Sequence, residues 1–389
     1  MRFSRVPMRL RWRFALAFAC ALFMPSGELL AQPTAKVVLG RWARGLRVGR
    51  DMDARGVKLY GSDLVDQDLR NARFDHCVLY GVRFVECNLT NSFFRGAVLG
   101  GASISGCWLD HADFTDAIIN DMDMTDSFLS LAPAQLVSTY SYKKKDLRKT
   151  MICGMPSKET GRAPEYDFRR ADLSGAKLCY GDFTKCDFTG ATMYQATIRF
   201  CVASFASLSP SKTFREGGLR EFTLANIWFV DACDFSGMDL TGARLSCLRN
   251  HAGPGPLPLN LTDALTQGAT FENDPVRVPT VTGEHLRSTA SYRQGDLSGI
   301  RLYDVDLAGV DLSNQNPTKA AFGHCDLTNV DFTDAVITAA DFVTFRYRRD
   351  PTKGLTADQI KSTWNYKHGR MEGIRLPLEI AQALRSEKE

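Results

Sequence analysis

A repeat of five residues runs through much of the chain. From Leu59 to Leu129, every fifth position holds a large apolar residue, fifteen in succession, and the position two residues earlier is small in most repeats. An α-helix repeats every ~3.6 residues and a β-strand every ~2, so neither produces this pattern. It indicates a chain that turns a corner after each unit, with the large residue (the centre) and the small residue before it facing a common axis.

The same period returns after each interruption. Further runs of centres extend over residues 168–198, 219–229, 235–245 and 297–342. Aromatic centres recur 20 residues apart, as in Phe74, Phe94 and Phe114. This spacing indicates four units per coil, with such rings stacked about 4.8 Å apart in successive coils. One centre of the last run is Pro317. Because proline lacks a backbone donor, it predicts a local bend or bulge.

Individual units resemble a known repeat. Residues 171–175 read Ala-Asp-Leu-Ser-Gly and residues 112–116 read Ala-Asp-Phe-Thr-Asp, which is similar to the A(D/N)Lxx signature of the pentapeptide-repeat family. The resemblance extends over roughly 60% of the chain after residue 31. It implies an all-β solenoid, the right-handed quadrilateral parallel β-helix. The breaks in the pattern indicate that short helices and loops interrupt this solenoid.

A second, longer repeat lies between the runs. Its copies span 131–142, 281–292 and 355–366, and a shorter copy starts at Leu208. We predict that each copy is a short helix that closes one stack of coils and feeds the next, because the open end of a solenoid needs a cover.

Helix-start signals support this interpretation. Thr356 and Gln359 have the spacing of a capping box, and Leu355 and Ile360 that of a hydrophobic staple. Two prolines, Pro133 and Pro210, suit the first turn of a helix.

These patterns divide the chain into nine segments. We predict a signal peptide over 1–31, an N-terminal cap over 32–56, repeat block 1 over 57–130, a helix and loop connector over 131–165, block 2 over 166–208, a short block 3 over 209–247, a Pro/Gly-rich loop and helix connector over 248–296, block 4 over 297–345 and a helical C-terminal cap over 346–389. The cap includes an amphipathic stretch after Pro377.

The first 31 residues have the form of a secretory signal peptide. Arg9, Arg11 and Arg13 precede the uncharged stretch 14–24, and Ala31 ends the expected cleavage site. We therefore expect a secreted or periplasmic protein; a cytosolic protein with a basic leader is the alternative. The stretch is too short for a stable membrane span. Once its five arginines and one glutamate are left out, 43 basic and 43 acidic side chains remain, so net charge does not indicate nucleic-acid binding.

The cysteines fall into two groups. Cysteine packs as a compact hydrophobic residue at the small inward position of a unit, which is held by Cys77, Cys87, Cys107, Cys186, Cys201, Cys233 and Cys325. Cys87 and Cys107 lie one coil apart on the same face, close enough in principle for a disulfide. Cys153, Cys179 and Cys247 lie outside the repeat, and their state stays open. The chain has no Cys-x-x-Cys motif that would indicate zinc.

Polar residues follow the repeat and do not form a recognisable site. His76, His111 and His324 each follow a centre by two residues, which places them at solvated corners. Aspartate is frequent directly before a centre. We interpret it as an acceptor for nearby backbone amides and not as a catalytic pair. The chain has no GxSxG, P-loop or HExxH motif. We predict no catalytic residues, no cofactor and no metal site, and binding residues are left unassigned.

Charge and motifs leave three functional classes. Residues 57–129 have a net charge of −6, whereas residues 143–149 and 346–349 are basic. The leading hypothesis is a non-enzymatic binding or structural scaffold of the cell envelope, with an unknown protein partner and no nucleic acid. The family resemblance also implies DNA mimics that act on topoisomerases, but such members are acidic throughout and cytosolic. The third class is an enzyme with its site in the loops 148–165 or 248–280. The oligomeric state stays open.

Overall fold

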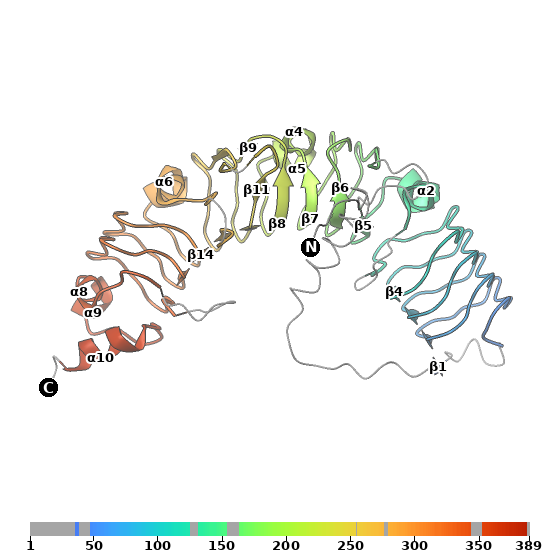
Figure 1. Ribbon diagram of the computed structural model, residues 1–389, viewed down its shortest axis with the longest axis horizontal. Coiled ribbons are helices and arrows are strands. Elements are labelled where there is room, and N and C mark those ends of the chain that lie inside the picture. Colours follow the sequence, from blue (N-terminus) through green and yellow to red (C-terminus); the bar gives the residue numbers. More distant parts are fainter. Residues whose placement is uncertain are drawn as a thin grey trace, which may run out of the picture. The chain divides into compact units, whose positions relative to one another are not determined.

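The computed structural model describes residues 36–38, 47–124, 131–153, 163–253, 255–275, 279–343 and 352–386. The predicted signal peptide and its cleavage site lie outside these residues. Within them, the chain forms short strands and bridges with brief helices between them, in the order shown in Figure 1. No helix in this part of the chain is long and apolar enough to cross a membrane.

Each five-residue unit is a short extended segment followed by a tight turn. The backbone amide of Phe74 donates to the Phe93 carbonyl in the next coil (2.7 Å), and the Phe74 carbonyl accepts from the amide of Cys77 (3.1 Å). The third residue of this turn has a positive φ, as type II turns require. Glycine, asparagine and aspartate, which tolerate that conformation, fill the position in many units. The predicted corner positions are confirmed, with φ between 56° and 57° at His76, His111 and His324.

Successive coils stack in parallel register. On one face, here called the strand face, the centres Leu64, Phe84 and Ile104 pair side by side. Their strands are β2 (Asp63–Val65), β3 (Arg83–Val85) and β4 (Ser103–Ser105), and β1 (Lys36–Val38) pairs antiparallel with β2 at the first edge. Equivalent residues of neighbouring coils in this block are 20 positions apart. Four units per coil are therefore confirmed.

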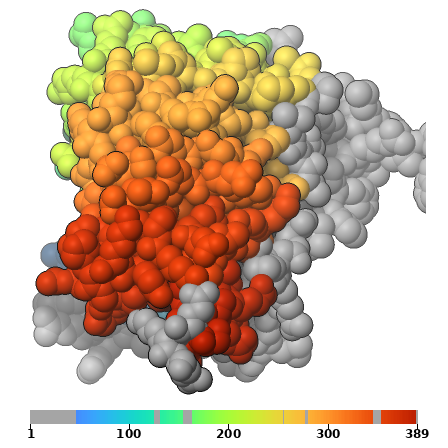
Figure 2. All heavy atoms as spheres, turned by 90° about the vertical axis from the view of Figure 1, so that its left-hand side faces the viewer, coloured from blue at the N-terminus to red at the C-terminus, as the bar shows by residue number. Residues whose placement is uncertain are grey.

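The strand face continues through the rest of the chain. It consists of β5 (Met151–Cys153), β6 (Lys177–Asp182), β7 (Thr197–Ala203), β8 (Thr223–Phe229), β10 (Arg244–Ser246), β13 (Thr270–Glu272), β14 (Arg301–Tyr303) and β15 (Ala321–Gly323), paired in that order. Two isolated bridges extend it to Asp341 and Arg375. On other faces, β9 (Cys233–Asp234) pairs with β12 (Leu259–Asn260), and β11 (Arg249–Asn250) pairs with the last two residues of β8, Trp228 and Phe229. Figure 2 shows the later coils following one another in sequence order from yellow to red.

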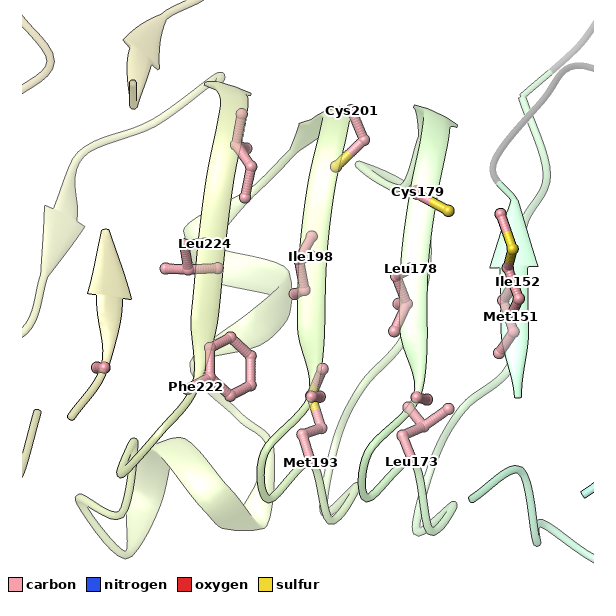
Figure 3. Packing of buried hydrophobic residues seen from close by; sticks show 14 of the residues in the cluster. Met151, Ile152, Leu173, Leu178, Cys179, Met193, Ile198, Cys201, Phe222 and Leu224 are labelled. Atoms are coloured by element: carbon pink, nitrogen blue, oxygen red, sulfur yellow. The ribbon is translucent and has the colours of Figure 1, made fainter. Parts of the chain in front are cut away.

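The core lies along the axis of the coils. Every described centre from Leu59 to Met124 is at most 3% exposed. Ring centroids are 4.9 Å apart for Phe74 and Phe94 and 4.8 Å apart for Phe94 and Phe114, with nearly parallel planes. The predicted aromatic column is thus confirmed, and later blocks have their own stacked pairs. Figure 3 shows centres such as Leu178, Ile198 and Leu224 side by side on β6, β7 and β8.

Within the described ranges, four pairs of short helices interrupt the coils. They are α2 (Pro133–Ser138) with α3 (Tyr140–Lys143), α4 (Phe205–Leu208) with α5 (Lys212–Arg215), α6 (Gly283–Ser288) with α7 (Ala290–Arg293), and α8 (Ala357–Lys361) with α9 (Trp364–Lys367). Each pair precedes one strand-face segment: β5, β8, β14 and Arg375, respectively. Two plain coils lie between successive helical coils.

The second helix of every pair lies on the same face, here called the helix face, whose first centres are Leu59, Leu79, Leu99 and Ile119. The first amide of each second helix donates to the preceding coil: Tyr140 to Ala117, Lys212 to Ala191, Ala290 to Ala264 and Trp364 to Ala335. Successive β-bridges connect these positions along one column. One series joins Asp146, Asp172 and Thr192, and another joins Gly218, Asp239 and Leu265. The helices therefore replace a wall segment of a coil.

Buried polar side chains replace the backbone acceptors that a helix removes. In each pair, one such side chain accepts from the amide of a centre in the preceding coil. These bonds join Ser141 Oγ to Ile119 (3.0 Å), Thr213 Oγ1 to Met193 (2.7 Å), Ser291 Oγ to Thr266 (2.7 Å) and Asn365 Oδ1 to Ile337 (2.7 Å). All four side chains are at most 1% exposed. The amides of these centres therefore have acceptors even though no strand backbone lies beside them. Buried backbone amides require such partners.

The helices do not close separate stacks, so that prediction was wrong. Across the first helical coil, the amide of Asp121 donates to Arg148 (3.0 Å) and that of Leu147 to Asp172 (2.8 Å). The amide of Asp121 and the carbonyl of Arg148 are 27 positions apart, whereas the equivalent bond of a plain coil joins Asp51 to Arg70, 19 positions on. The coil therefore lengthens while its pairing continues. Because side chains supply the missing acceptors, the chain can insert helices without ending the stack.

The second helical copy is placed differently from the prediction. α4 begins after the N-cap Ser204 and ends at Leu208, and α5 begins after the N-cap Ser211. Leu208 therefore ends a helix instead of starting the copy, and Pro210 lies between the helices. The capping box of Thr356 and Gln359 is confirmed, and Pro133 is the first residue of α2.

Other local predictions also need correction. Pro317 causes no bulge: it is buried, and the pairing spacing around it is unchanged, because only one amide donor is lost. Residues 259–272 form a further coil where a loop was expected, with Leu261, Thr266 and Phe271 as buried centres. Coiling already starts before residue 57, since Ala54 is buried and Asp53 bridges to Arg73.

The C-terminal segment combines another coil with a helix. Before the final helix, Arg375 still pairs with Asp341, so the segment is more than a helical cap. α10 (Leu378–Ser386) follows; it buries Leu384 but leaves Leu378 72% exposed.

Candidate interaction surface

The aspartates before the centres bind backbone, as predicted. The Asp113 carboxylate accepts from the Thr115 amide (2.9 Å), and Asp331 accepts from Thr333 (2.8 Å). The same bond to the residue two positions on is made by Asp68, Asp172, Asp182, Asp187, Asp296, Asp306, Asp311, Asp326 and Asp341. Each of these carboxylates therefore stabilises its own turn.

Ion pairs add to this role at some corners. Asp326 accepts from Lys353 Nζ (2.8 Å) and from the Thr328 amide (3.0 Å). The lysine contact and then the threonine contacts lower the pKa of Asp326 to about 2. Asp68 is similar: its contact with Arg70 lowers its pKa to about 2.

We expect Asp326→Asn to weaken the acid dependence of stability. The ordinary pKa of 3.8 falls to about 2 in the folded protein, so this carboxylate stabilises the fold above pH 3.8 and loses that effect as the pH falls toward 2. The variant keeps an acceptor for Thr328 but no charge for Lys353. Melting temperature measured from pH 5 to about 2 should fall less steeply in the variant. Identical slopes would contradict the assignment.

The ten cysteines in the described ranges are free thiols in the structure. Those predicted at small inward positions are buried, at most 3% exposed. Of the remaining three, Cys247 is at a corner with φ 50° and is half-buried, and Cys153 and Cys179 lie in β5 and β6. No group of three or more His, Cys, Asp or Glu residues suited to a metal occurs in the described ranges.

The helix face of block 1 carries an apolar surface, here called the tyrosine surface. It consists of Tyr60, Val78, Tyr80, Val98, Ile118 and Tyr140. The aliphatic residues form one column, since Val78 bridges to Val98 and Val98 to Ile118, and the Tyr140 amide continues the column on α3. Tyr60, Tyr80 and Tyr140 are 39%, 58% and 44% exposed. Exposed apolar residues gathered in this way mark interaction sites more often than scattered ones do.

Glycines flatten the surface beside the tyrosines. The Tyr80 ring lies against the next coil, where a Cβ on Gly101 would be 3.6 Å from the ring. Gly61, Gly81 and Gly101 occupy the adjoining corners with positive φ. Because glycine has no side chain, these corners leave the ring of Tyr80 accessible to a partner from that side.

Basic residues flank both ends of the tyrosine surface. Lys58 is exposed at the first coil. At the other end, Lys144 Nζ lies 5.6 Å from the centroid of the Tyr140 ring, and Lys143 Nζ contacts Asp116 (2.8 Å). The surface is therefore apolar in the middle with cations at its ends, although block 1 as a whole is acidic.

The sequence contained a signal for this surface that the search for motifs missed. Outward positions of a unit are usually polar, yet Val78, Val98 and Ile118 repeat at the coil length of 20 residues. An apolar column at outward positions is not needed for the core. The structure also shows that Tyr140 joins it through the helix.

Comparison with protein families identifies the repeats. The model described as pentapeptide repeats matches eight copies, over residues 77–116, 92–130, 167–199 and 296–334. The chain belongs to the pentapeptide-repeat proteins and forms their right-handed quadrilateral β-helix. Proteins with this fold act in general as non-enzymatic scaffolds.

Two solved structures of the same class are similar to the chain at low sequence identity. HetL, a pentapeptide repeat protein involved in heterocyst differentiation regulation from the cyanobacterium Nostoc sp. strain PCC 7120, is 20% identical over 76% of this chain and 90% of its own, with a TM-score of 0.20. Full-length QnrB1, a plasmid-mediated fluoroquinolone resistance protein, is 15% identical over 84% of this chain and 96% of its own, with a TM-score of 0.14. With such TM-scores, neither similarity carries an inference about function. No curated protein matches the chain.

Proposed function

We propose that this pentapeptide-repeat protein is a non-enzymatic scaffold of the cell envelope that presents a rigid β-helical surface to a protein partner. The tyrosine surface is the observation that carries the proposal. Tyrosine contributes large contact area with few rotatable bonds and is enriched at protein interfaces. A surface fixed by a backbone ladder loses little conformational entropy when it binds.

The charge distribution favours this scaffold over a DNA mimic. Several acidic residues of block 1 pair with neighbouring bases, as in Asp68–Arg70 (2.5 Å) and Asp113–Arg95 (2.5 Å), so its negative charge is interrupted although the block remains acidic. A DNA mimic needs an extended row of uncompensated negative charge. The cations flanking the tyrosine surface favour a partner segment that is apolar with acidic ends.

We expect Tyr80→Ala to reduce partner capture from the envelope fraction about tenfold, because losing a central aromatic contact commonly costs about 1.4 kcal/mol or more. Tyr194→Ala is the matched control: Tyr194 is 42% exposed and follows its centre Met193 as Tyr80 follows Leu79, but has no aliphatic column beside it. Cross-linking followed by mass spectrometry would measure recovery. Equal recovery with both variants would contradict this surface.

Export is a separate part of the proposal. The positive leader and apolar stretch before Ala31 support it. N-terminal sequencing of the native protein should find a start near Gln32, in an extracytoplasmic fraction. An intact Met1 would contradict export without bearing on the tyrosine surface.

A further inference from the structure

Two cysteines that the sequence left open lie side by side on neighbouring coils. Cys153 in β5 pairs in register with Cys179 in β6, and their sulfur atoms are 3.9 Å apart. Cys179 is fully buried and Cys153 is 5% exposed. Each directly follows a buried residue of its strand, Ile152 or Leu178, and both belong to the buried hydrophobic cluster; Figure 3 shows Cys179 beyond Leu178 on the strand next to β5.

We propose that Cys153 and Cys179 form a disulfide that joins two successive coils when the chain folds under oxidising conditions. Neighbouring strands are about 4.8 Å apart, within the Cα separation of about 4.4–6.8 Å that a disulfide spans. The sulfur atoms need to approach by about 2 Å to reach bonding distance. Rotation of the two side chains supplies this movement without a change of register.

The oxidant is a disulfide of a protein or small molecule. One cysteine thiolate attacks a sulfur of that disulfide, forms a mixed disulfide and releases one thiol. The second cysteine then attacks the mixed disulfide, forms the Cys153–Cys179 bond and releases the other thiol. The two cysteines lose two protons and two electrons, and the oxidant is reduced to two thiols.

The surroundings of the pair favour retention of the bond. The contact with Cys153 and then burial raise the pKa of the Cys179 thiol. Because both residues are buried, the folded coils would shield the bond from reductants.

The cysteine pair predicted from the sequence as close enough to bridge is arranged differently. Cys107 Sγ accepts from the backbone amide of Cys87 (3.3 Å), and Cys87 Sγ is 3.1 Å from the Leu64 carbonyl. Both thiols point into the core and have backbone partners, so we expect them to stay reduced.

The test is oxidative refolding of the purified protein in a glutathione buffer, followed by denaturation, alkylation and peptide mass mapping. We expect a loss of two alkylatable thiols and a linked peptide that contains Cys153 and Cys179. Cys179→Ala should restore full alkylation of Cys153. Alanine suits the position, because Ala225 occupies it two coils further on. The matched control, Cys201→Ala, removes a buried thiol of β7 and should keep the link.

Full alkylation of Cys153 and Cys179 in oxidatively folded protein would overturn the proposal, and so would a disulfide that joins other cysteines. If Cys179→Ala does not fold, Cys153→Ser provides the same comparison. Because the purified protein is used, failure of this cross-link is distinguishable from failure of export or of partner binding.

Discussion

Phe94→Ala is expected to destabilise block 1 by about 3–5 kcal/mol, because truncating a buried phenylalanine removes its burial and leaves a cavity. Phe94 is fully buried and stacks between Phe74 and Phe114 at 4.9 and 4.8 Å. Its removal breaks two ring contacts at once. In a solenoid each coil is stabilised mainly by its neighbours, so the loss should be concentrated in block 1. Native-state hydrogen exchange of the full chain would measure it there.

Phe93→Ala is the adjacent control. Phe93 precedes the centre and points outward as the repeat predicts, but it is half-buried, with the guanidinium groups of Arg73 and Arg95 at 5.6 and 5.3 Å from its ring centroid. Exposed cation–π contacts contribute about 0.5–1 kcal/mol, so we expect a loss of about that size. A loss at Phe93 equal to or larger than that at Phe94 would contradict the assignment of the two faces.

Asn365→Ala is expected to destabilise the last coils by at least about 2 kcal/mol, since a buried donor or acceptor without a partner costs about 1–3 kcal/mol. The Asn365 side chain accepts from the Ile337 amide (2.7 Å) and donates to Thr338 Oγ1 (3.0 Å) and the Arg370 carbonyl (3.0 Å). Alanine leaves the Ile337 amide without an acceptor in the core. Hydrogen exchange at Ile337 is the direct readout.

The other helix pairs provide the rescue variant. Serine holds the equivalent position at Ser141 and Ser291, so Asn365→Ser keeps an acceptor near Ile337 while losing the amide donors. We expect it to recover part of the stability. If alanine and serine are equally destabilising, the acceptor at this position is not what maintains the ladder.

The coils were predictable because each five-residue unit contains the sequence signals for its own conformation. A centre such as Phe94 and the left-handed corner after it follow from five consecutive residues, and no distant contact is needed to place them. The same reasoning failed where a single position held a residue type that departs from the repeat. Thr266 is a polar centre, so the coil that contains it looked like part of a loop.

The helical coils show the limit of sequence patterns more clearly. Their start signals, such as Pro133, were visible, but a capping signal does not tell on which wall of a solenoid a helix lies. That depends on side chains such as Ser141, which accept from an amide that is 22 residues earlier in the chain. The tyrosine surface depends on the same placement, because Tyr140 extends the column only when α3 replaces the wall.

From α2 onward, two plain coils separate successive helical coils, so three coils are the structural unit of this part of the chain. A duplication or deletion of a whole unit would preserve both the backbone pairing at the junctions and the wall on which the helices emerge. A duplication of one or two coils would also preserve the pairing but would change the interval between helices. The number of coils and the interval between helices can therefore evolve independently. The pairing of coils depends on the five-residue unit, whereas the interval between helices depends on the three-coil unit.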